Sequence, residues 1–137
     1  MTRINVVPVQ ELTNQHLLAE YREITRLPSN LNKALNRKGK PFDLSEIPPE
    51  YVLGTGHVKF FFNKMLFLSK RFELLVNELI KRGYNINYTD STIFLQCDDT
   101  FKNDYIPTQE ALEMNRQRIN DRLSKSKVRV WSSEKHV

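Results

Sequence analysis

One stretch of the chain gathers side chains that could bind a phosphate and move a proton. If a helix begins near Asn14, its turn of about 100° per residue places one carboxylate, Glu23, between two arginines on a single face. This face comprises Gln15, His16, Ala19, Arg22, Glu23 and Arg26. Arg22 and Arg26 are like charges that destabilise an isolated helix slightly unless an anion lies between them. Guanidinium groups bind phosphate in a planar, bidentate geometry, so the pattern indicates a phosphate-binding face; a solvated charged face is the alternative.

Metal and thiol chemistry have no matching pattern in the sequence. His16 has no second His or Cys at the spacing of a zinc site, and by itself it is typical of a surface or hydrogen-bonded histidine. Cys97 is the only cysteine, which excludes an internal disulfide and a metal site built from cysteines alone. We therefore expect Cys97 to be inert and His16 to have no zinc-binding role.

The composition bounds the class of protein. A chain of 137 residues, with 39% hydrophobic and 27% charged residues, is typical of one globular domain. The net charge of +5 and the sequence pI of about 9.4 favour a polyanionic partner such as nucleic acid. No apolar run reaches the length of a membrane span, and no secretory signal opens the chain, so we expect a monomer in the cytoplasm with no membrane contact.

The residues on the charged face must be positioned by a helix that also has an apolar side. We predict this helix over residues 14–37, with Thr13 as its N-cap. Its opposite, apolar stripe consists of Leu17, Tyr21, Ile24, Pro28, Leu31 and Leu35. Because proline lacks an N–H and clashes with the preceding turn, we expect a kink or break at Pro28.

Two further helices complete the predicted core. Residues 64–82 form a broadly apolar helix, with Asn63 as N-cap and Gly83 just past its end. Its predicted core stripe is Met65, Leu68, Phe72, Leu75, Val76 and Leu79, widened by Phe61, Phe62, Leu66, Phe67 and Ile80. The last helix starts after Thr108, its N-cap, and ends near Ser124.

The remaining segments read as irregular chain. Proline and glycine interrupt residues 38–56, and residues 84–107 show no period apart from a possible short strand at residues 92–95. Lysines and arginines recur at residues 33–40 and 116–129, where they could follow a DNA backbone or serve only solubility. The predicted fold is all-α: a single compact domain of three helices with irregular connecting loops and a loosely packed basic tail over residues 124–137.

Several of these stretches match a known family. The chain resembles the phage pyrimidine-dimer DNA glycosylase/AP lyases, the small UV-repair endonucleases of T-even-like phages. The matching segments are MTRIN at residues 1–5, QHLLAEYRE at 15–23 followed by Arg26, LGTGHVKFF at 53–61, KRGYNI at 81–86 and DYIP at 104–107. Two features depart from the family: Thr25 stands where the family has proline, and the tail holds one aromatic residue, Trp131, where the family has several.

The resemblance implies a function and a set of site residues. It implies an enzyme of the host bacterial cytoplasm that needs no metal and no organic cofactor. The enzyme would excise cyclobutane pyrimidine dimers from double-stranded DNA and then cleave the abasic site by β-elimination, with a base opposite the lesion flipped out. Thr2 would supply a nucleophilic α-amine and Glu23 the catalytic carboxylate. The residues that would contact DNA are Arg3, Gln15, His16, Arg22, Arg26, Arg118 and Arg122, the last in place of a family lysine.

An α-amine suits this chemistry, because a Schiff base forms only from an unprotonated amine. The ordinary pKa of an α-amino group is about 7.7–8.0, against about 10.4 for lysine, so its free-base fraction at neutral pH is roughly 300-fold larger. Nearby Arg3, Arg22 and Arg26 would lower that pKa further. Thr2 can react only once Met1 has been removed.

Three other functions are compatible with parts of the sequence. A non-catalytic basic DNA-binding protein would use the arginines only to hold phosphates. A protein-interaction module would expose the Phe-rich helix over residues 64–82, which its predicted core role argues against. A metal-dependent nuclease would lose its activity in a chelator.

Overall fold

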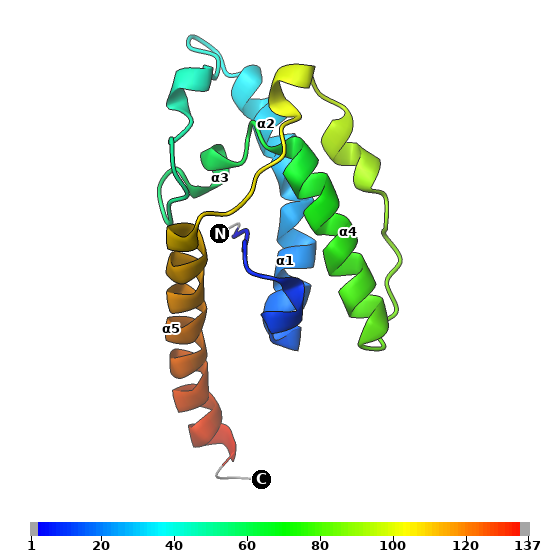
Figure 1. The fold of residues 1–137 in the computed structure, drawn as a ribbon, viewed down its shortest axis with the longest axis vertical. Helices are drawn as coiled ribbons and strands as arrows, with labels where there is room; N and C mark the ends of the chain where they lie inside the picture. Colours follow the sequence, from blue (N-terminus) through cyan, green and yellow to red (C-terminus); the bar gives the residue numbers. More distant parts are fainter. Residues whose placement is uncertain (1–2, 135–137) are drawn as a thin grey trace.

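The protein is built from α-helices and short 3-10 turns. The computed structural model describes the backbone of residues 3–134 and the side chains of residues 3–124. Within this range the fold class is all-α as predicted, with no β-strand, but it has four helices of ten or more residues where three were predicted. They are α1 (Asn14–Ile24), α2 (Arg26–Leu35), α4 (Met65–Lys81) and α5 (Gln109–Glu134), with a single-turn α3 (His57–Phe60) between α2 and α4 (Figure 1).

The extra helix arises because the predicted helix over residues 14–37 is divided in two. Thr13 caps α1 as predicted: its hydroxyl oxygen accepts the backbone N–H of His16 at 3.2 Å. The break lies at Thr25 rather than at Pro28, which belongs to the first turn of α2. A proline ring clashes with the carbonyl four residues earlier, here that of Ile24, the last residue of α1. The break therefore falls one turn ahead of the proline that causes it.

Helix α4 is the centre of the core. All six residues of its predicted stripe are buried, whereas Ile80, expected to widen it, is 53% exposed. The N-cap is Lys64, not Asn63 as predicted. At the other end Gly83 adopts a positive φ of 93°, and Tyr84 N–H donates to the carbonyl of Leu79, which closes the helix. Helices α1 and α4 pack side by side (Figure 1).

The last helix is longer than predicted. Thr108 caps α5 as expected, since its hydroxyl accepts the N–H of Ala111 at 3.1 Å, but the helical backbone runs to Glu134 rather than ending near Ser124. The tail predicted over residues 124–137 is thus helical in backbone through Glu134; its side chains beyond Ser124 lie outside the described residues. Helix α5 stands apart from α4, on the other side of α1 (Figure 1).

Residues 38–56 and 84–107 were predicted to be irregular, and within them the chain forms the 3-10 turns η2 (Leu44–Glu46), η3 (Ser91–Leu95) and η4 (Asp99–Phe101). Ser91–Leu95 forms a 3-10 turn, η3, instead of the possible strand at residues 92–95. The Asp90 carboxylate starts this turn by accepting the N–H of Thr92 at 2.9 Å, and Phe94 buries its ring in the core. The described part of the chain holds no helix with the length and apolar character that crossing a bilayer requires.

Candidate DNA interface and catalytic site

The first residues of the described chain are fixed by side chains instead of by regular structure. We call residues 3–7 the N-terminal segment; it runs between α1 and α5 (Figure 1). The N–H of Ile4 donates to His57 Nε2 at 2.9 Å. The N–H groups of Val6 and Val7 both donate to Asn115 Oδ1, at 2.6 and 3.1 Å. Ile4 and Val7 are fully buried, so the segment is held inside the fold and does not fray as chain ends often do.

A buried ion pair forms hydrogen bonds to the same segment. Arg71 of α4 donates from Nε to Glu20 Oε2 at 2.7 Å and from Nη2 to Glu20 Oε1 at 2.9 Å. Both side chains are almost fully buried, at 4% and 1% exposure. Glu20 Oε1 also accepts Asn5 Nδ2 at 2.9 Å, and Asn5 Oδ1 accepts Asn115 Nδ2 at 2.8 Å. Arg71 Nη1 donates to the carbonyl of Val7. This network joins α1, α4 and α5 through the N-terminal segment.

The predicted catalytic carboxylate lies against the start of the chain. Glu23, in the last turn of α1 and half-buried, accepts the backbone N–H of Arg3 at 3.0 Å. Thr2, the predicted nucleophile, lies outside the described residues. The nitrogen bonded to Glu23 is the one that joins Arg3 to Thr2 in the sequence, so the contact is made at the residue next to the predicted nucleophile.

Positive side chains from three elements surround this point. Burial lowers the pKa of Arg3, and the charge of Arg122 lowers it further while Glu23 raises it. The pKa of Arg118 is lowered by burial and then by Arg3. Burial also lowers the pKa of His16, with Arg118 and Arg122 acting in the same direction. The N-terminal segment, α1 and α5 therefore contribute to one cluster, in which arginine charges act on Arg3, Arg118 and His16.

The cluster has unused hydrogen-bonding capacity. His16 Nδ1 and Arg118 Nε are buried atoms without a hydrogen-bond partner among the described residues. A buried polar atom without a partner costs roughly 1–3 kcal/mol, so these two atoms favour a bound group that would satisfy them. Because arginine charges lie nearby, an anion is the kind of group that this cluster would favour.

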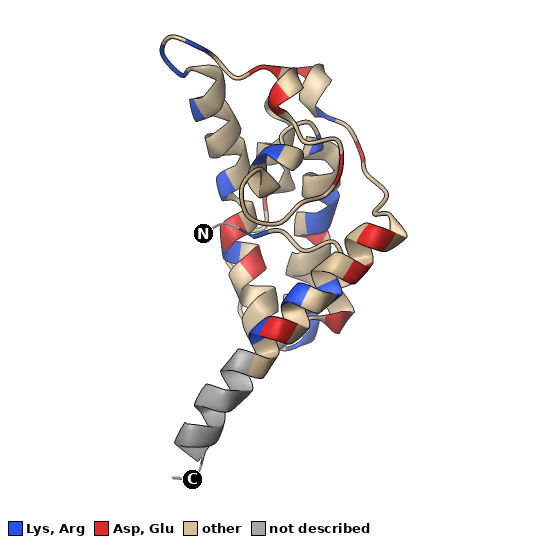
Figure 2. Cartoon of the chain, turned by 90° about the vertical axis from the view of Figure 1, so that its left-hand side faces the viewer, with Lys and Arg blue, Asp and Glu red and all other residues tan. Residues whose placement is uncertain are grey.

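The other predicted DNA-binding residues lie along the same helical face. Arg22 and Arg26 are exposed on either side of Glu23, at the end of α1 and the start of α2. Gln15 is exposed in the first turn of α1, about 12 Å along the helix axis from Glu23. Basic positions recur along α1 and α2 and along α5 (Figure 2). No described contact brings Gln15 to Glu23, so it belongs to the edge of the site.

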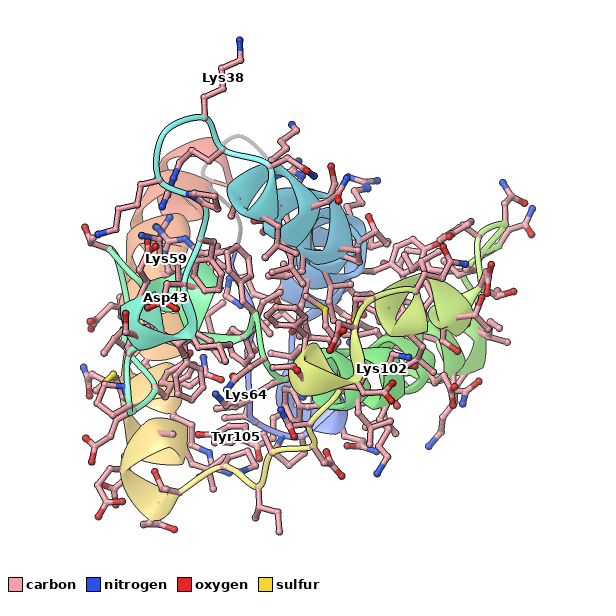
Figure 3. All side chains as sticks on the ribbon, turned by 90° about the horizontal axis from the view of Figure 1, so that it is seen from above. Lys38, Asp43, Lys59, Lys64, Lys102 and Tyr105 are labelled. Carbon is pink, nitrogen blue, oxygen red and sulfur yellow. The ribbon has the colours of Figure 1, made fainter. Side chains whose placement is uncertain are left out.

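Arginines elsewhere in the fold are paired, unlike those of the site. Salt bridges join Arg37 to Glu46, Arg71 to Glu20, Arg82 to Glu78 and Arg116 to Glu11. Arg3, Arg22, Arg26, Arg118 and Arg122 make no ion pair with any described residue. In the basic stretch over residues 33–40, Arg37 is thus neutralised, whereas Lys38 projects from the loop after α2 (Figure 3).

A second amine in the fold has an unusual pKa. Burial lowers the pKa of Lys64 to about 8. Its Nζ donates to the carbonyl of Phe60 at 2.8 Å and lies 3.8 Å from the centre of that ring, near Tyr105 (Figure 3). Any test of Schiff-base chemistry must therefore show that the reacting amine is not that of Lys64. In this structure the Lys64 amine donates hydrogen bonds to Phe60 and Asn63.

Sequence reasoning missed the residues that hold the N-terminal segment. His57 lies within the matching stretch LGTGHVKFF, and its position there is the only signal that could have pointed to it. Glu20 sits beside the charged face and is buried, and Asn115 carries no pattern at all. Within the described residues, no three His, Cys, Asp or Glu side chains are grouped as metal ligands would be.

Comparison with known protein families yields a match. A family model described as "Pyrimidine dimer DNA glycosylase" matches residues 1–92, well over half of the chain. The matched region contains the N-terminal segment, the charged face of α1 and α2, and His57; α5 lies beyond it. Because the family model covers most of the chain, including Glu23 and the arginines of α1 and α2, the chain belongs to the pyrimidine dimer DNA glycosylase family.

Proposed function

We propose that this protein excises cyclobutane pyrimidine dimers from double-stranded DNA through the α-amine of Thr2, after removal of Met1, and then cleaves the strand at the resulting abasic site. The amine attacks the sugar carbon that bears the damaged base, and the base leaves with the electrons of its glycosidic bond. The nitrogen then gives up a proton, and its lone pair breaks the bond from that carbon to the ring oxygen, which takes up a proton. The iminium that results acidifies the C–H bond of the neighbouring sugar carbon. Loss of that proton expels the 3′ phosphate, and water then releases the enzyme.

One observation carries this proposal: the 3.0 Å hydrogen bond between Glu23 Oε1 and the backbone N–H of Arg3. Three covalent bonds separate this backbone nitrogen from the α-nitrogen of Thr2, a span of at most about 4 Å. The Glu23 carboxylate therefore lies within about 7 Å of the amine. In that position it can stabilise the cationic imine and carry the proton between steps.

The arginine cluster supports DNA as the partner. Beyond the effect of burial, the charge of Arg122 lowers the pKa of Arg3, and the charges of Arg3 and Arg122 lower that of Arg118, which means that positive charges repel within the cluster. Binding of phosphate groups would relieve this repulsion, and guanidinium is suited to phosphate oxygens. Arg22 and Arg26 extend the positive surface along the helices on both sides of Glu23.

The chemistry proposed for these residues requires no metal, because amine, carboxylate and arginines supply the nucleophile, the proton carrier and the phosphate contacts. The competing proposal is a DNA-binding protein without catalysis. Both proposals predict binding that weakens with salt, so only covalent chemistry or strand cleavage separates them.

Two forms of the N-terminus provide the test. A fusion protein can be cleaved to give one chain that begins at Thr2 and another that carries a short Gly-Ser extension before it. Both are incubated, in EDTA, with a duplex that holds a single thymine dimer, and strand cleavage is followed on a gel. We expect cleavage by the free form only. Cleavage by both forms would contradict the role of Thr2, and binding without cleavage by either would favour the non-catalytic protein.

A further inference from the structure

A nucleophile at a chain end has no helix or strand to aim it. The N-terminal segment makes its backbone hydrogen bonds with side chains, and the first residue whose N–H and carbonyl are both held is Ile4. His57 Nε2 accepts the N–H of Ile4 at 2.9 Å, and the hydroxyl of Tyr51 donates to the carbonyl of Ile4 at 3.3 Å. We call His57 and Tyr51 the Ile4 clamp.

We propose that the Ile4 clamp positions the α-amine for attack on the sugar, so that His57 and Tyr51 are positioning residues of the reaction. The inference rests on the proposed function of Thr2. Ile4 follows Thr2 by two residues, and Arg3, between them, is the residue whose N–H is bound by Glu23. The clamp and Glu23 together fix consecutive peptide groups directly after the nucleophile.

The clamp itself is rigid. His57 is 4% exposed, and its Nδ1 lies 2.8 Å from the carbonyl of Val52, which fixes the ring from the opposite side. Because Nε2 accepts the hydrogen bond of the Ile4 N–H, Nδ1 carries the ring hydrogen and donates a hydrogen bond to the carbonyl of Val52. The rings of His57 and Tyr51 pack edge to face, 5.5 Å apart, and Phe61 packs on His57 at the same distance.

The protonation states suit this role. Burial lowers the pKa of His57, so the ring stays neutral at physiological pH and Nε2 remains an acceptor. Burial raises the pKa of Tyr51, so its hydroxyl keeps the proton that it donates to Ile4. A protonated His57 would place a second N–H against that of Ile4 and break the clamp.

Helix α5 connects the segment to the DNA-binding surface. Asn115, fully buried, accepts from Val6 and Val7, and Arg118 lies one turn further along the same helix. The helix that contributes Arg118 to the anion site therefore also holds the segment behind the clamp. Arg118 and the clamp are near neighbours, since the charge of Arg118 lowers the pKa of His57.

Two substitutions of His57 separate positioning from packing. His57→Gln can keep an acceptor near the place of Nε2, facing Ile4, but loses the donor to Val52. His57→Asn keeps a donor near the place of Nδ1, facing Val52, but loses the acceptor for Ile4. Both remove the imidazole ring from the same packing, so they form a matched pair.

The readout is the single-turnover rate of borohydride trapping on a thymine-dimer duplex, at a temperature where circular dichroism shows each variant folded. Mass spectrometry confirms that Met1 is absent from each. We expect His57→Asn to lower the trapping rate about 100-fold, the loss that a misplacement of about 1 Å can cause, and His57→Gln to stay within about threefold of the wild type. The affinity of both variants for the duplex should match that of the wild type.

Equal losses in the two variants, or a loss that appears only as weaker DNA binding, would overturn the proposal. If His57→Asn does not fold, Tyr51→Phe replaces it, because this change removes only the hydroxyl that donates to Ile4. We expect it to slow trapping about tenfold, a loss of one hydrogen bond, with unchanged DNA affinity; an unchanged trapping rate would overturn the clamp. Failure of the wild type to form any adduct would instead overturn the proposed function, which keeps the two failures distinct.

Discussion

Among the residues that the structure describes, Glu23 is the one on which the proposed chemistry depends most. Its carboxylate accepts the N–H of Arg3, and a neutral amide could keep this hydrogen bond while losing the charge that stabilises an imine. We therefore expect Glu23→Gln to lower the rate of strand cleavage by about 100-fold or more with little change in DNA affinity. A gel-based cleavage assay at saturating enzyme measures this.

The matched control for this change is Glu50→Gln. Glu50 is exposed, lies in the loop before α3 and makes no hydrogen bond or ion pair with any residue that the structure describes. The Glu50→Gln variant should cleave the damaged strand at the wild-type rate. If Glu23→Gln cleaved as fast as Glu50→Gln, the carboxylate would have no part in the chemistry.

The histidines make stability depend on pH. Burial lowers the pKa of His57 in the folded protein, whereas the unfolded chain titrates near the ordinary value of about 6.5. Below that pH the unfolded state binds a proton that the folded state does not, so the free energy of unfolding is greatest above pH about 6.5 and falls as the pH drops. The lowered pKa of His16 acts in the same direction.

We therefore predict that the free energy of unfolding falls less in His57→Gln than in the wild type when the pH drops from 7.5 to 5.5. His16 should account for part of the pH dependence that the variant keeps. Urea denaturation at several pH values measures the difference. If the free energy of unfolding fell equally with pH in the two proteins, the prediction would be wrong. His57 would then bind a proton equally in the folded and unfolded states over this pH range.

At the scale of elements, the ion pair of Glu20 and Arg71 joins α1 to α4 beneath the N-terminal segment. Both side chains are almost fully buried, so removing one leaves the other as an uncompensated charge. We expect Arg71→Met to lower the free energy of unfolding by about 3–5 kcal/mol. The double variant Glu20→Gln with Arg71→Met should recover part of this loss in the same denaturation experiment, and no recovery would argue against a buried charge as the cause.

The sequence allowed the helices to be predicted more accurately than their boundaries. Thr13 and Thr108 are N-caps because a threonine hydroxyl can satisfy a free N–H of the first turn, and both were predicted from local sequence. The division at Thr25 was placed three residues late, because a proline acts on the carbonyl four residues before it. Residues 92–95 could form a strand only beside a partner strand, which the described chain does not provide, and they form a 3-10 turn instead.

At the scale of the whole molecule, the unpaired arginines predict how binding depends on salt. Each phosphate contact contributes about 0.9 to the slope of log affinity against log salt on duplex DNA. We expect Arg22→Gln to reduce this slope by about 1, measured by fluorescence anisotropy on an undamaged duplex. Lys81→Gln removes the same charge from the exposed end of α4 and should leave the slope unchanged. Equal effects of the two changes would indicate that only net charge matters.

The site was predictable only in the part that is local in sequence. The charged face of α1 could be recognised because Arg22, Glu23 and Arg26 follow the helical period. The network that fixes the N-terminal segment could not, because it joins residues as distant as Asn5 and Asn115, which are 110 positions apart. Nothing in the composition of either neighbourhood indicates that the two side chains meet.

The most direct test of the proposed mechanism is to map the covalent adduct itself. The protein beginning at Thr2 is mixed with duplexes that carry a thymine dimer or an abasic site, in EDTA, and treated with borohydride; the adduct is then located by mass spectrometry. We predict an adduct at the α-nitrogen of Thr2 on both duplexes. An adduct at Lys64, whose pKa burial lowers to about 8, or no adduct on either duplex would contradict the account.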